Sequence, residues 1–274
     1  MKLLALTLHT MNVTLSQKIT AGLLAAMAIL LFIIIFTVHI DSGDGIINSI
    51  SIYGSRPISG ADLPHILPQV AETYTALYFL AAIVLSVIAT AQIIPEAINN
   101  RTFILYLSKP ISRRSIILAV FTGVTAAITL VQLIFVVSFW IILTAKTGIW
   151  NWNLLFSAIP LIVSFSALYA LMVYIGIIGK STGMVTALAL AHVLLVSHLL
   201  SSQEGYMGAA LGRPFYQIFR NIVRTVLPGV HELQEMTFSI MMTRSADVTI
   251  FILSLLPCTL YLWLSIRAFR RMDF

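Results

Sequence analysis

The residues with the most obvious chemical potential are Gly179-Lys180-Ser181-Thr182, whose order matches the end of a nucleotide-binding P-loop. The full pattern, G-x-x-x-x-G-K-[ST], needs a glycine five residues earlier, where this chain has Tyr174. A P-loop also follows a β-strand, whereas the preceding tract is uncharged and apolar enough to be a membrane-spanning helix. We therefore expect a short turn that carries one basic residue.

The other reactive side chains are scattered. His192 and His198 are six residues apart, which puts them on different faces of a helix, whereas a metal pair needs a spacing of three or four. Met241 and Met242 are more typical of membrane packing than of a soft-metal site, and the single cysteine, Cys258, excludes a disulfide framework. We expect no catalytic residue, no metal site and no cofactor on this chain, so it is not an enzyme by itself.

The composition of the chain indicates the kind of fold that holds these residues in place. The 274-residue chain is 59% hydrophobic and 9% charged, with a mean hydropathy of +0.99, whereas soluble domains are about 25% charged. These values exclude a soluble globular enzyme and a disordered protein. The fold class is an all-α membrane protein, a single transmembrane domain over residues 1–274 with six uncharged segments of about 20 residues. These spans are near 19–38, 73–94, 115–145, 154–179, 182–200 and 248–266.

The basic residues are divided unevenly between the two sides that these spans imply. The side with both termini, the 95–114 loop and Lys180 carries ten Lys and Arg against two acidic residues, a net +8. The other side has six against eight, a net −2. The positive-inside rule then puts both termini in the cytoplasm of a multi-pass protein. Topology explains the overall +6, so nucleic acid is not an expected partner.

Segments outside the spans have patterns of their own. Residues 1–18 are expected to form a short interfacial helix, and the 40–72 loop to contain turns and one short helix near Ala61–Leu67. The outer segment 201–247 has two amphipathic stretches separated by Pro228-Gly229, which we expect to lie on the outer leaflet. In the first of them, Arg220 and Arg224 either extend to lipid headgroups or meet an anionic substrate at an outer gate.

The loop at 95–114 is the most distinctive segment. Pro95 and Glu96 suit the first turn of a short helix, and Pro110 ends it before the third span. Along this segment an acidic residue, Arg101-Thr102, an apolar run and Lys109-Pro-x-Ser-Arg113 occur in that order. A loop that served only to carry positive charge would not need this series.

At this loop the sequence resembles the type-2 class of ATP-binding-cassette (ABC) exporter permeases, in particular the branch that contains the permease of the nitrous-oxide-reductase maturation transporter. The matching residues are Glu96, Arg101-Thr102 and the run Leu107–Arg113, together with the closing Phe269–Phe274 and Leu227–Val230. The family often has Gly-Lys a few residues after the arginine that corresponds to Arg113, where this chain has Leu118-Ala119-Val120.

The resemblance implies that the chain is the permease subunit of an ATP-driven exporter in the cytoplasmic (inner) membrane of a prokaryote. It implies two copies of a separate ATPase subunit that hold ATP and Mg, and a second permease copy or a related permease, besides membrane lipids. The loop would be the coupling helix that docks in the ATPase. The residues expected to contact it are Glu96, Arg101, Thr102, Phe103, Tyr106, Lys109, Pro110, Ser112 and Arg113.

Two other functions remain open. One is a non-transporting membrane scaffold or assembly factor with the same fold, and the other is a carrier or channel that works alone. The spans contain almost no ionisable residue, whereas ion-coupled carriers need intramembrane acids or polar-lined broken helices. This favours an energy source outside the chain.

Overall fold

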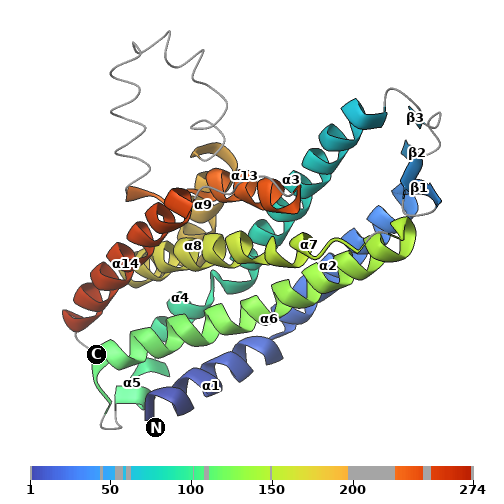
Figure 1. The fold of residues 1–274 in the computed structure, drawn as a ribbon. Coiled ribbons are helices and arrows are strands. Elements are labelled where there is room, and N and C mark those ends of the chain that lie inside the picture. Colours follow the sequence, from blue (N-terminus) through green and yellow to red (C-terminus); the bar gives the residue numbers. More distant parts are fainter. Residues whose placement is uncertain are drawn as a thin grey trace, which may run out of the picture.

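The computed structural model describes residues 2–43, 46–52, 58–59, 63–100, 102–107, 111–148, 150–196, 226–242 and 248–272. These form long helices that run along one another, with a small sheet at one end (Figure 1). The helices of the first half are α1 Lys2–Ser16, α2 Lys18–Thr37, α3 Leu63–Thr90, α4 Ile93–Asn99, α5 Thr102–Leu107 and α6 Arg113–Thr147. Those of the second half are α7 Asn153–Phe156, α8 Ala158–Gly179, α9 Thr182–Ala191, the π-helix η2 His192–Val196, α13 Val230–Met241 and α14 Val248–Arg270.

Within the described residues, five helical segments are long and apolar enough to cross a membrane, which confirms a mostly helical, multi-pass membrane protein. They are Lys18–Thr37, Glu72–Asn99, Arg113–Lys146, Asn153–Gly179 and Thr249–Arg270, and each coincides with an expected span. The remaining expected span, 182–200, is described as far as Val196. There α9 and η2 form a shorter apolar helix, and residues 197–200 lie outside the described part of the chain.

The 40–72 loop differs from our expectation. It contains three short antiparallel strands in the order β1–β2–β3, with bounds Val38–Gly43, Ile46–Ile52 and Ile58–Ser59. Val38 pairs with Ile52, and Ser49 with Ser59, with a register shift at Asp41/Ser42. The strands were not predicted, and the expectation of a separate short helix near Ala61–Leu67 was wrong; residues 44–45 and 53–57, where turns were expected, lie outside the described residues. The helix near Ala61–Leu67 is the start of α3, which continues without a break into the second span.

Local signals set the long helices. The Ser112 hydroxyl caps α6 by accepting a hydrogen bond from the Ser115 amide at 3.2 Å. Gly148 ends α6 with φ of 70°, a left-handed conformation that glycine adopts without steric cost. The core lies between α3, α6 and α8, where the following side chains are fully enclosed: Phe79, Ile83, Ile128, Phe165 and Leu168.

The helices have two distinct ends (Figure 1). At one, which we call the α5 end, α1 begins, α14 ends and α4–α5 link α3 to α6. At the other, the β-sheet end, the three strands lie near the end of α6 and the start of α3.

Candidate functional site

The loop between the second and third spans folds as two short helices rather than the expected one. Pro95 lies in the first turn of α4, as predicted, and is buried with Ile94. A Cβ atom on Gly176 of α8 would lie 3.1 Å from the Ile94 Cβ, so the glycine allows α4 to approach α8 closely. The Asn99 amide also donates a hydrogen bond to the Lys180 carbonyl at 3.1 Å. These contacts fix α4 against the end of α8.

The second short helix, α5, is held from two sides by rings. Phe103 is fully buried, and its ring meets that of Phe269 on α14 edge-on with centroids 5.0 Å apart. Tyr106, half-buried, has its ring 6.5 Å from that of His9 on α1. Burial raises the pKa of the Tyr106 phenol above its ordinary value of 10.0. Thus α5 connects α1 with α14.

Arg113 strengthens this connection from the first turn of α6. Its Nη1 donates hydrogen bonds to the backbone carbonyls of Phe269, Arg270 and Met272, at 3.4, 3.0 and 2.6 Å. The last carbonyls of a helix have no intrahelical partner, and their partial negative charge attracts a cation. Arg113 therefore fastens the end of α14 to the start of α6.

The residues expected to contact an ATPase differ in accessibility. Glu96 and Ser112 are exposed, whereas Thr102, Tyr106 and Arg113 are partly covered. The prediction fails for Phe103 in this conformation, because its side chain is enclosed within the chain and has no surface for a partner. Arg101, Lys109 and Pro110 lie outside the described residues.

The Gly179–Thr182 segment is a turn between two helices, as predicted, and not a strand–loop–helix. Lys180 ends α8 in a left-handed conformation with φ of 49°, and its side chain is exposed. The Ser181 hydroxyl then caps α9 by accepting a hydrogen bond from the Met184 amide at 3.5 Å.

The outer amphipathic segment is described in part. Pro228-Gly229 does precede a helix, α13, but its apolar side packs on α3 and α8 within the chain, burying Val230, Leu233, Met236 and Thr237. The expectation that this face lies on the outer leaflet was wrong, because an amphipathic pattern does not distinguish lipid from protein. Arg220 and Arg224 lie outside the described residues.

His192 packs as a buried polar residue of the core. Its Nε2 lies 2.9 Å from the Pro228 carbonyl, which ties the start of η2 to the segment before α13. His198 lies outside the described residues.

The sequence did not single out His9, or the pairing of Phe103 with Phe269. Both contacts join segments far apart along the chain, and only the aromatic character of the segments hinted at them. No protein-family model matches this chain, and no curated protein is significantly similar to it. The functional argument therefore depends on the residues and contacts at the α5 end.

Proposed function

We propose that this chain is the membrane-spanning permease subunit of an ATP-driven ABC exporter, and that α4 and α5 form the lever on which a separate ATPase subunit acts. The observation that carries the proposal is the attachment of α5 to α1 and α14 through Tyr106 and Phe103. A short helix held in this way transmits a displacement to its neighbours, because packed interfaces shift as units rather than deform continuously.

Accessible charge supports a docking role at the same place. Glu96 is exposed in the first turn of α4, so its carboxylate is accessible to a partner. The buried side chains of Ile94 and Pro95 hold the helix in position. A helix with one side buried in the protein and an exposed charged residue on the other suits a contact that must bind a partner and transmit its movement. Glu96 and Ser112 are the residues that we expect to set the register of the partner.

The remaining parts of the proposal follow from the pattern of charge and hydropathy. The uncharged tract 182–200, of which α9 and η2 are the described part, is the proposed sixth span, and the +8 side faces the cytoplasm of a prokaryotic cell. The permease does not catalyse hydrolysis itself. ATP and Mg are held by two ATPase copies, and this chain pairs with a second copy or with a related permease.

Affinity purification from native membranes tests the proposal. A tagged wild-type chain, solubilised in mild detergent, is expected to retain an ATPase subunit with Walker motifs in a 1:1 ratio to total permease, measured by quantitative mass spectrometry. Glu96→Ala should reduce that ratio several-fold, because truncating one partner of a docked charge pair costs about 2–5 kcal/mol.

The matched control is Lys18→Ala, which removes one exposed charge at the start of α2 without touching α4 or α5. It should retain the ATPase as the wild type does. If the wild-type chain purifies with no ATPase at all, the scaffold or the independent carrier replaces the exporter.

A further inference from the structure

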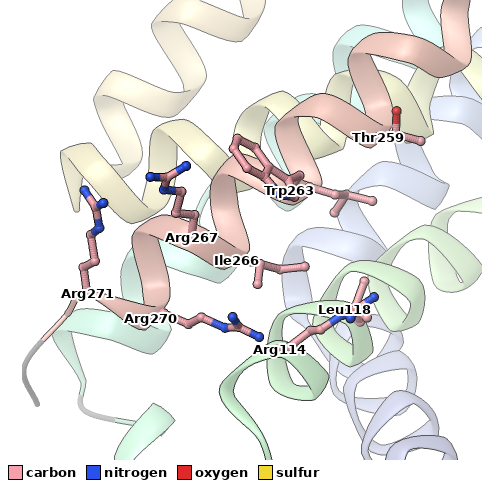
Figure 2. A pocket seen from close by; sticks show the side chains of 9 residues that line it. Arg114, Leu118, Thr259, Trp263, Ile266, Arg267, Arg270 and Arg271 are labelled. Atoms are coloured by element: carbon pink, nitrogen blue, oxygen red, sulfur yellow. The ribbon is translucent and has the colours of Figure 1, made fainter.

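A second feature of the α5 end is an open groove of about 630 Å³ between the first turns of α6 and the last turns of α14 (Figure 2). It lies outside the contacts of α5. The groove is lined by Arg114, Leu118, Thr259, Leu262, Trp263, Ile266, Arg267, Arg270 and Arg271. In Figure 2 the side chain of Arg270 points from α14 toward Arg114 on α6.

The charge of this groove is unbalanced. Its four arginine side chains are exposed, and within the described part of the chain no carboxylate lies within ion-pair distance of any of them. The helix dipole favours Arg267 and Arg270 at the end of α14 but opposes Arg114, which stands in the first turn of α6 beside Arg113 with no acidic residue there. The neighbouring Arg113 donates to three carbonyls, whereas no described residue makes such a contact with Arg114. The positive charge of this cluster therefore attracts an anion.

Apart from Thr259, the rest of the groove is apolar. Leu118, Leu262 and Ile266 form this part of its wall on the two spanning helices, and Ile266 and Leu118 lie beside Arg270 and Arg114 (Figure 2). Trp263 is 55% exposed, and the Arg267 guanidinium lies 5.3 Å from the centre of its ring. Tryptophan and arginine at the end of a spanning helix are typical of the depth at which lipid headgroups lie. An occupant must therefore have an anionic head and an apolar tail.

We infer that this groove binds an anionic phospholipid, with its phosphate on Arg114 and Arg270 and an acyl chain along Leu118 and Ile266. Arginine suits this role because its planar guanidinium binds two phosphate oxygens at once. Bound there, the lipid phosphate offsets part of the positive charge of the four arginines, and the lipid bridges α6 to α14 beside the contact made by Arg113. A soluble anion would use only the polar half of the groove.

Titration of the detergent-purified chain with phosphatidylglycerol, with bound lipid counted by native mass spectrometry, tests this inference without any ATPase. Wild-type protein is expected to retain phosphatidylglycerol and to lose phosphatidylcholine of the same chain length. The double variant Arg114→Gln/Arg270→Gln should weaken phosphatidylglycerol binding about thirtyfold. Arg114→Lys/Arg270→Lys, which keeps the charge, should recover part of the loss.

The control, Lys18→Gln/Lys180→Gln, removes two positive charges from exposed positions outside the groove and should bind phosphatidylglycerol like the wild type. Thermal unfolding of each variant checks that the fold is intact. The inference is wrong if the groove variant binds as tightly as this control. It is also wrong if inorganic phosphate displaces the lipid at comparable concentration, since the groove would then be a site for small anions.

Discussion

At the scale of single residues, Arg113 contributes more to the packing of the α5 end than its position in the sequence indicates. It was expected to contact a partner, but its guanidinium reaches the last carbonyls of α14. Hydrogen bonds that involve a charged group contribute about 1.5–3 kcal/mol, roughly twice a neutral one. The same residue therefore closes the ring of contacts that runs from α6 through α14 to α5.

Arg113→Ala should lower the free energy of unfolding in detergent by about 2 kcal/mol, because the α14 carbonyls lose a charged donor. The last turn of α14 should also exchange its amide hydrogens faster. The control Lys18→Ala, which removes an exposed positive charge at the start of α2, should change neither quantity measurably. Equal effects of the two substitutions would show that the hydrogen bonds of Arg113 add nothing.

At the scale of elements, α1 and α2 follow one another along the length of α6. The Thr7 and Thr122 hydroxyls are 3.3 Å apart, and Lys146 donates a hydrogen bond to the Ile35 carbonyl near the other end of α6. At about 1.5 Å per residue, the 35 residues of α6 extend over roughly 52 Å, more than a bilayer core of about 30 Å. The tilts seen in membrane proteins, up to about 40°, do not remove this excess, so α6 extends beyond the hydrocarbon layer.

The packing of α1 on α6 depends on Gly123. A Cβ atom there would lie 2.7 Å from the Thr7 carbonyl oxygen and 2.8 Å from the Thr10 Cβ, so the two helices would have to separate. Gly123→Ala is expected to destabilise the chain by about 1–3 kcal/mol, measured by unfolding in detergent.

Gly22→Ala is the matched control for Gly123→Ala. A Cβ atom on Gly22, within α2, meets nothing within 4 Å, so alanine there should stabilise the chain by about 0.5–1 kcal/mol through its higher helix propensity. A Gly123→Ala variant as stable as the Gly22 variant would mean that α1 does not pack on α6 in this way.

Hydropathy predicted the long helices within a few residues, apart from the start of α3 at Leu63, since an uncharged tract such as 115–145 has few alternatives to a spanning helix. It did not predict the three strands between residues 38 and 59, because Gly43 and Pro57 indicated turns there. The pairing of Val38 with Ile52 joins residues that are 14 positions apart in the sequence. For α13, the pattern predicted the helix but not what covers Leu233. These features depend on contacts between distant segments, which periodicity does not contain.

At the scale of the whole molecule, the two ends have different compositions. Three of the four tryptophans, Trp140, Trp150 and Trp152, gather toward the β-sheet end with ring centroids 5.1 to 5.9 Å apart, and the fourth, Trp263, lies toward the α5 end. Tryptophans near both ends of spanning helices match the two interfaces of a bilayer. The candidate site at the α5 end was predicted as a segment, but its attachment through Phe103 and Phe269 was not, because burial of an aromatic ring cannot be read from a short loop.

The most direct test of the account is photo-crosslinking in intact membranes. A photoreactive amino acid at Glu96, exposed on α4, should form a covalent adduct with an ATPase that carries Walker motifs, identified by mass spectrometry. The control position is Ile134, which is 59% exposed on α6 between its two ends, at bilayer depth. Our account predicts the adduct at Glu96 and none at Ile134. Absence of the ATPase adduct at Glu96, or an equal yield at Ile134, would contradict the proposed docking of an ATPase on this segment.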